Sequence, residues 1–298
     1  MIKFYTISPQ GVPENPHLFP MMRPTFIEKG NVFVDRIEGA DCVLLDLHTR
    51  IAEYKDCDFS RILSSGISVS SFDEFDKGGM SHLEWPSPLN WQQLYIFKHI
   101  KDNNIKSVHF CRLLDKTKSY QENLFPYEKP ILYEEPLLTP EQLFDRPYDV
   151  VWIANTAPQR EMFKKVLEED GRLKTKIILG AEKIPLQDWI DAHKEGKMFV
   201  SWSAGGAGDE KIQHLFSVAG IIKEANNQLF LHDFTHLENC IRPNPNPTKE
   251  DIDTIVEIVN DKERLYEIYK NGYDFVKKYY SAEYIASNIL ETILKHII

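Results

Sequence analysis

The stretch Met198–Gly220, MFVSWSAGGAGDEKIQHLFSVAG, decides the fold of the second half of the chain. It begins with an apolar run of strand character, Met198–Trp202, and continues through a glycine-rich turn, Ser203–Gly208. An amphipathic segment that Asp209 opens follows directly, so the order predicts a strand, a loop and a helix. In such a unit the glycines let backbone N–H groups approach an anion, and the positive end of the helix dipole points toward it. A phosphate or diphosphate is therefore the expected ligand.

The glycine-rich turn matches neither of the two best-known phosphate-binding motifs. It contains no G-x-x-x-x-G-K-[ST] sequence, and Lys211 occupies the position of the third glycine in a dinucleotide-binding fingerprint. Asp209 has two opposite effects, because its carboxylate caps a helix well but repels a phosphate. From the turn alone, a phosphate cradle and a turn without a ligand both remain open.

Length and composition predict a soluble cytoplasmic protein of two domains. The chain has 298 residues, 42% of them hydrophobic, which is enough for two cores of ordinary size. Its four cysteines are scattered without a C-x-x-C pair, so neither a disulfide framework nor a zinc site is expected. We find no basic leader and no apolar stretch of about 20 residues that would span a membrane. The net charge of −10 argues against a general affinity for nucleic acid or anionic lipid.

The second half alternates strand and helix patterns. Strands are expected at 148–154, 176–180, 198–202 and 228–232, with helices at 158–169, 185–193 and from Asp209 onward. Three further helices are expected to begin at Thr248, Asp261 and Ser281, the second of them ending at Asn271 and Gly272. Strands separated by helices form parallel βαβ units, which bind ligands at the C-terminal ends of their strands. The last helix carries apolar residues that need a partner: Ile285, Ile289, Leu290, Ile293 and Leu294.

The first half shows a similar pattern with less regularity. Strands are expected at 2–7, 42–47, 67–70 and 105–110, and a helix at 90–101. Five prolines between residues 126 and 147 exclude long helices there. This proline-rich stretch is therefore predicted to be an extended linker between two domains.

Four segments of the chain carry a resemblance to one known family: Val108–Leu113, Tyr148–Asn155 with Arg160 five residues on, Lys197–Gly220 and Asp261–Tyr280. The first is similar to a strand that ends in an arginine, and the second to the opening of the family's second domain. The third is similar to its strand, glycine loop and helix, and the fourth to its tail of short helices. From Ile105 to Leu294 the order of elements resembles the GT-B type glycosyltransferases, especially the CgeB-like and exostosin-like group.

The resemblance implies both a fold and an activity. The implied fold is α/β, with two Rossmann-like domains facing across a cleft and a C-terminal helix that returns to the first domain. An acceptor-side domain would comprise residues 1–140, a nucleotide-sugar-binding domain residues 145–280, and the returning helix residues 281–298. The implied activity moves a sugar from a nucleotide-sugar donor to a glycan, a lipid-linked sugar, a protein or a modified base, without a cofactor.

This reaction needs a cradle for the leaving diphosphate and, if it inverts the sugar, a base for the acceptor hydroxyl. The candidates for donor binding are Arg160, Lys197, Ser203, Gly205, Gly206, Gly208 and Lys211. The candidate bases are Asp73, Asp76 and His82, with His109 as a further one. The segment 70–79, SSFDEFDKGG, follows a strand-like run, so we expect it at a strand's C-terminal end, where α/β sheets place their ligands.

Some patterns in the sequence match metal-binding motifs literally. Residues 56–58 and 251–253 both read Asp-x-Asp, and His232 and His236 have H-x-x-x-H spacing. The first Asp-x-Asp follows no clear strand, and the second fits the first turn of a helix, where acidic residues suit the dipole. His232 ends a predicted strand, so the two histidines need not share a helical face. GT-B proteins generally do not depend on an ion bound by Asp-x-Asp, so the resemblance implies no essential metal.

One departure from the family pattern leaves alternatives open. The family commonly carries a glutamate five residues before the final Gly220, where it holds the donor ribose, and this chain has Leu215 there. A catalytically silent GT-B-like binding protein would show the same pattern. A phage-type enzyme that glycosylates a modified DNA base would keep the chemistry and change the acceptor, although the acidic net charge counts against it.

Overall fold

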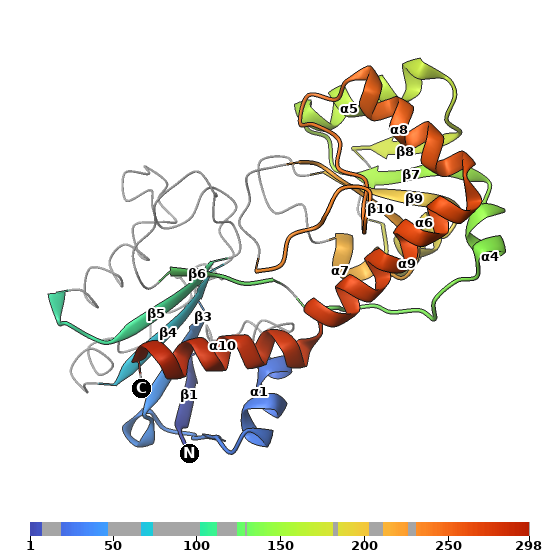
Figure 1. Ribbon diagram of the computed structural model, residues 1–298. Helices are drawn as coiled ribbons and strands as arrows, with labels where there is room; N and C mark the ends of the chain where they lie inside the picture. The colour runs from blue at the N-terminus through green and yellow to red at the C-terminus, as the bar shows by residue number, and fades with distance from the viewer. Residues whose placement is uncertain are drawn as a thin grey trace. The chain divides into compact units, whose positions relative to one another are not determined.

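The computed structural model describes residues 1–7, 19–46, 67–73, 102–111, 124–128, 130–180, 184–202, 211–225 and 231–297. The chain divides into two compact units, shown in Figure 1. The first unit consists of Met1–Pro130, Gln228–Leu231 and Ala282–Ile298, and the second of Ile131–Asn227 and His232–Ser281. Both units contain a parallel sheet with helices packed on it, so the predicted α/β class is confirmed.

The first unit is built on a six-stranded sheet in the order β2-β1-β3-β4-β5-β6. Its strands are β1 (Lys3–Ile7), β2 (Val32–Phe33), β3 (Cys42–Asp46), β4 (Ser68–Asp73), β5 (Ser107–Cys111) and β6 (Leu124–Pro126). Every neighbouring pair runs parallel, so all the C-terminal strand ends lie at one edge. The helix predicted at 90–101 lies outside the described residues.

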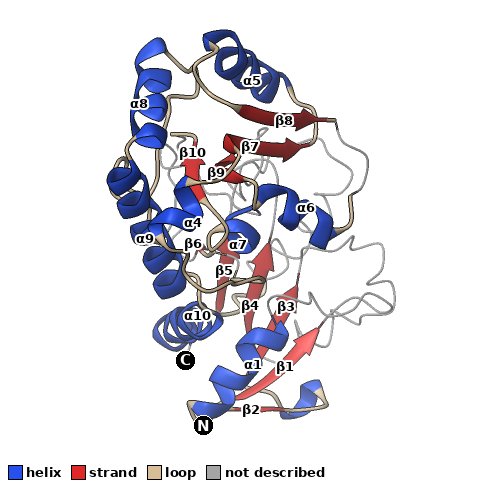
Figure 2. Ribbon diagram, turned by 90° about the vertical axis from the view of Figure 1, so that its right-hand side faces the viewer, coloured by secondary structure: helices blue, strands red, loops and turns tan. Residues whose placement is uncertain are grey.

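Helices α1 (Phe19–Glu28) and α10 (Ala282–Ile297) pack together on this first sheet (Figure 2). A short 3₁₀ helix spans Ile37–Gly39. The apolar stripe of α10 lies in the same buried cluster as Phe4 and Phe110 of the sheet. The expected return of the last helix to the first unit is therefore confirmed, because most of the stripe is buried there. Leu294 is the exception, since it is 41% exposed.

Truncation of one α10 side chain gives a test of this packing. Ile289 is 2% exposed within the buried cluster, so Ile289→Ala is expected to lower the free energy of unfolding by about 2–5 kcal/mol. Glu291 is exposed on the same helix, so Glu291→Ala should change it by less than about 0.5 kcal/mol. Urea denaturation followed by circular dichroism measures both, and equal stabilities would contradict the packing.

The second unit is built on a four-stranded parallel sheet in the order β10-β9-β7-β8. Its strands are β7 (Tyr148–Ala154), β8 (Thr175–Leu179), β9 (Gly196–Ser201) and β10 (Gly220–Lys223). Its helices are α4 (Pro140–Phe144), α5 (Pro158–Asp170), α6 (Leu186–His193), α7 (Ile212–Leu215), α8 (Lys249–Asn260) and α9 (Lys262–Tyr279). The proline-rich segment that precedes α4 is hydrogen-bonded to this unit, because the backbone N–H groups of Leu132 and Tyr133 both donate to Gln213 O.

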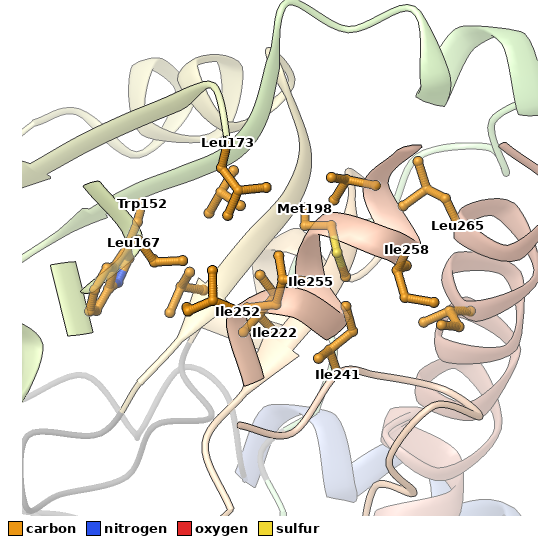
Figure 3. Packing of buried hydrophobic residues seen from close by; sticks show 14 of the residues in the cluster. Trp152, Leu167, Leu173, Met198, Ile222, Ile241, Ile252, Ile255, Ile258 and Leu265 are labelled. Atoms are coloured by element: carbon orange, nitrogen blue, oxygen red, sulfur yellow. The ribbon is translucent and has the colours of Figure 1, made fainter. Parts of the chain in front are cut away.

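Helices cover both faces of the second sheet. On one face, α5 and α8 bury a cluster in which Ile252 and Ile255 of α8 meet Ile222 of β10 (Figure 3). On the other face, the side chains of α6 and α7 pack around Phe199 of β9 and Ile221 of β10. The two clusters use alternate residues of the same strands, as expected for a sheet that is buried on both sides.

Strand β10 was not predicted from the sequence, and the elements beside it in the chain differ from the predicted ones. Gly220 was expected at the end of a helix, but it begins β10, where a Cβ would stand 3.1 Å from Met198 Cε of β9. The helix expected from Asp209 is described only as the four-residue α7. The strand predicted at 228–232 is also wrong in part, because Leu231 and His232 form a bend and residues 228–230 lie outside the described chain.

The helical tail was predicted more accurately. Thr248 and Asp251 form the reciprocal capping box of α8, and Asp261 caps α9 through the backbone N–H of Arg264. The stop expected at Gly272 is wrong, because α9 continues to Tyr279. A Cβ at Gly272 would lie 2.6 Å from Asn239 O, so this glycine serves a close approach between the helix and a loop.

Candidate functional site

The strand order of the second unit places a topological switch point between β7 and β9. The chain passes from β7 through α5 to β8 on one side, and returns through α6 to β9 on the other side of β7. Helix α5, after β7, packs on one face of the sheet, whereas α7, after β9, packs on the opposite face. The segments that follow β7 and β9 therefore diverge, and open α/β sheets bind their ligands at such a point.

Arg160 of α5 bridges the C-terminal ends of these two strands. Its Nε donates a hydrogen bond to Trp202 O at 3.1 Å, directly after β9. Its Nη1 donates to Asn155 O at 3.0 Å, directly after β7. The side chain is half-buried, so the sheet edge carries a fixed guanidinium group at the switch point.

Lys211 bridges the same two strands, nearer their centres. Its Nζ donates to Ile153 O at 3.0 Å and to Val200 O at 3.2 Å, and it lies 5.6 Å from the centre of the Trp152 ring. Desolvation lowers the pKa of Lys211 well below its ordinary value, and the positive charge of Arg160 lowers it further. Two basic side chains thus meet where the strands end, and such a pair favours an anionic ligand.

The predicted glycine cradle adjoins this pair in the sequence. Ser203, Gly205, Gly206 and Gly208 lie outside the described residues. The described chain stops at Trp202, whose carbonyl holds Arg160, and resumes at Lys211. Both flanks of the glycine-rich turn therefore belong to the switch point.

Lys197, also predicted to bind the donor, lies elsewhere. It is the second residue of β9, and its Nζ pairs with Asp149 Oδ1 at 2.8 Å and donates to Val259 O at 3.1 Å. These contacts are at the N-terminal edge of the sheet, and the ammonium group also covers the Phe144 ring at 4.6 Å. We therefore assign Lys197 to the structural framework and leave it out of the candidate site.

Leu215 is a core residue of the second unit. Its side chain is fully buried and belongs to the cluster around Phe199 and Ile221. The position therefore contributes apolar packing, and a carboxylate there would be buried among hydrocarbon side chains.

The first sheet has a switch point of its own, between β1 and β3. The chain passes from β1 to β2 on one side and then to β3 on the other, and β3 ends at Asp46. β4, the next strand along, extends to Asp73, three residues beyond the end predicted from the sequence. Asp76 and His82 lie outside the described residues. Asp46 was not a candidate from the sequence, because its place at the switch point depends on the strand order.

The histidines that drew attention in the sequence have structural surroundings. Burial lowers the pKa of His109 to about 3, and its Nε2 lies 3.1 Å from Ser107 Oγ, so it is a poor base. His232 stacks on Tyr279 at 3.8 Å, and His236 Nδ1 accepts from Arg242 N at 2.9 Å. Within the described residues, no three His, Cys, Asp or Glu side chains form a group that could hold a metal ion.

Three solved structures resemble the chain over its whole length. An alpha-glucosyltransferase in complex with UDP and a 13-mer DNA containing a HMU base has a TM-score of 0.59 at 11% identity, covering 98% of this chain and 99% of its own. Anabaena HepE, in complex with UDP and glucose, has a TM-score of 0.58 at 9% identity, with coverage of 99% and 100%. Sucrose-phosphate synthase from Thermosynechococcus elongatus has a TM-score of 0.55 at 10% identity and 99% coverage of both chains.

Sequence comparison adds nothing to these structural matches. No protein-family model and no curated protein matches the chain. Among the residues that the structure describes, no helix is long and apolar enough to cross a membrane. At identities near 10% a structural likeness shows the fold alone. The chain therefore has the GT-B fold, with two Rossmann-like units built on parallel sheets.

Proposed function

We propose that the protein is a glycosyltransferase that moves a sugar from a nucleotide-sugar donor to an acceptor. The observation that carries this proposal is the pair of basic side chains, Arg160 and Lys211, at the switch point of a GT-B second unit. The fold shared with an alpha-glucosyltransferase and with HepE, both solved with UDP, supports a uridine or related nucleotide as the donor group.

The diphosphate is the part of the donor that this site would hold. It becomes the leaving group when the sugar is transferred, so negative charge develops on it in the transition state. Arg160 supplies a planar donor group to such oxygens, and Lys211 lies beside it. The backbone N–H groups of Ser203–Gly208, which the sequence predicts as a cradle, are proposed to complete the site, because preorganised N–H dipoles stabilise such charge.

We propose that the chain belongs to the CgeB-like and exostosin-like group. The donor ribose would then need a partner other than the glutamate that this group commonly carries. Leu215 is part of the core, so the family's ribose carboxylate has no equivalent at this position. Turnover separates an active enzyme from a silent binding protein. Incubation with nucleotide sugars and a panel of acceptors should release free nucleoside diphosphate, whereas binding without any release would identify a silent protein.

The acceptor would bind to the first unit, at the C-terminal edge of its sheet. Asp73 at the end of β4, with Asp76 and His82 after it in sequence, are the proposed candidates for the acceptor base. A glycan, a lipid-linked sugar or a protein fits this proposal better than duplex DNA, because the net charge of −10 opposes the approach of a polyanion. We place the reaction in the cytoplasm.

A thermal-shift panel of UDP, GDP, CDP and their sugars tests the donor proposal. A ligand present at about 100 times its Kd stabilises the folded state by about 2.7 kcal/mol, which raises Tm by several degrees. One nucleotide class should raise Tm together with its sugar conjugates. A flat response to the whole panel would contradict nucleotide-sugar binding.

The reaction is further proposed to need no metal ion and no cofactor. Arg160 and Lys211 would take the place of a cation at the diphosphate. Treatment with EDTA, followed by gel filtration, should leave the rate of nucleoside diphosphate release unchanged. Loss of the rate that added Mg²⁺ or Mn²⁺ restores would overturn this part of the proposal.

A further inference from the structure

Among the described residues, none places a compensating negative charge in contact with the Lys211 side chain. Its contacts are two backbone carbonyl oxygens and the face of Trp152. Within the described residues no carboxylate contacts it, and the charge that acts on it is that of Arg160. The carbonyl oxygen of Ile153 is shared with Trp189 Nε1, at 3.2 Å, so it is not fully available to the lysine.

The elements around Lys211 bring other titratable groups to this region. They are Arg160 on α5, His193 on α6, His214 on α7, and Lys223 and Glu224 at the end of β10. Desolvation lowers the pKa of His193 to about 3, and Lys211 contributes to that shift, so the imidazole is neutral near pH 7. In the described part of the chain the buried amine therefore contacts no anionic group, and burial of an amine favours its neutral form.

A diphosphate would change this balance. It brings negative charge to the ends of β7 and β9, where the Lys211 amine and the Arg160 guanidinium already lie. An opposite charge within a few ångströms favours the protonated lysine and so opposes the effect of burial. The guanidinium keeps its charge in either state.

We propose that Lys211 takes up a proton from solvent when the donor diphosphate binds and returns it when the nucleoside diphosphate leaves. This inference rests on the proposed function of the same site. The proton moves from buffer to Nζ, and no covalent bond to the substrate forms or breaks. Over the pH range in which the free protein holds a neutral Lys211 and the complex a charged one, affinity falls up to tenfold for each pH unit of increase.

Calorimetric titration with UDP-glucose and with GDP-mannose measures the proton directly. Both phosphates of these probes are esterified, so neither phosphate gains or loses a proton near neutral pH. Titrations in two buffers of different ionisation enthalpy give the number of protons bound per ligand. We expect about one proton at pH values between the pKa of Lys211 in the free protein and its pKa in the complex. Failure of every nucleotide sugar to bind would overturn the proposed function, whereas binding without proton exchange would overturn only the role of Lys211.

Three variants assign the proton to its group. Lys211→Arg carries a permanent charge, so it should bind the probe without proton uptake and with an affinity that is flat in pH. Lys211→Met should also lose the uptake. Lys165→Met removes a lysine from the exposed side of α5, where Lys165 pairs with Glu169 at 3.6 Å, and should keep the uptake of the parent. Uptake that persists in both Lys211 variants would contradict the assignment.

The free protein gives an independent test. The folded-state pKa of Lys211 lies below the unfolded value of about 10.4, so between the two values the unfolded chain binds one proton more. The stability of the parent should therefore rise with pH relative to that of Lys211→Met, and level off near the unfolded value. Urea denaturation of both proteins across this range measures the difference. Parallel stability curves would show that Lys211 is charged before the ligand arrives.

Discussion

Replacement of Arg160 with methionine is expected to slow sugar transfer by about 10²- to 10³-fold, the usual cost of removing one donor that stabilises developing negative charge. The guanidinium is held by the carbonyls of Asn155 and Trp202, so it is oriented before a ligand arrives. Methionine keeps much of the aliphatic stem and removes the charge. The measurement is the rate of nucleoside diphosphate release with saturating acceptor.

Two further variants separate this role from a structural one. Arg160→Lys keeps a charge but cannot span both strand ends, so its rate should lie between those of the parent and of Arg160→Met. Arg172 is an exposed arginine after α5 that pairs with Asp170 at 2.6 Å, and Arg172→Met should transfer sugar at the parent rate. A parent-like rate in Arg160→Met, with unchanged nucleotide affinity, would remove Arg160 from the site.

Loss of the acceptor base should have the largest effect, about 10²- to 10⁴-fold on the transfer rate. Asp73→Asn, Asp76→Asn and His82→Ala test the three residues proposed for this role. Asp46→Asn belongs in the same series, because Asp46 ends β3 at the switch point of the first sheet. The variant that removes the base should bind UDP-glucose or GDP-mannose as tightly as the parent. Parent rates in all four variants would contradict a base in this part of the first unit.

The hydrophobic periodicity of the sequence predicted most strands of the second sheet, and its helix-capping residues predicted where the C-terminal helices begin. The apolar run Tyr148–Ala154 coincides with β7, and the capping box of α8 was readable as Thr248 and Asp251. Glycines were the main source of error, because a glycine that ends a helix and one that permits close packing look alike in a sequence. Gly220 and Gly272 are both of the second kind.

The composition of the site was harder to predict than the fold. Lys197 stands close to the glycine-rich turn in sequence, but a six-residue strand spans about 20 Å, which places it at the opposite edge of the sheet. Arg160 and Lys211 were predicted to bind the nucleotide-sugar donor, but nothing in the sequence indicated why the two side chains should lie close together. The reason is that β9 pairs with the edge of β7 that β8 leaves open. This pairing joins residues far apart in the sequence, so the local sequence pattern does not predict it.

A crystal structure of the protein with UDP tests the central claim most directly. We predict that the diphosphate lies at the C-terminal ends of β7 and β9, with Arg160 and Lys211 Nζ within hydrogen-bonding distance of its oxygens and the N–H groups of residues 203–208 directed toward it. A diphosphate bound at any other edge of either sheet, with neither Arg160 nor Lys211 in contact, would contradict it.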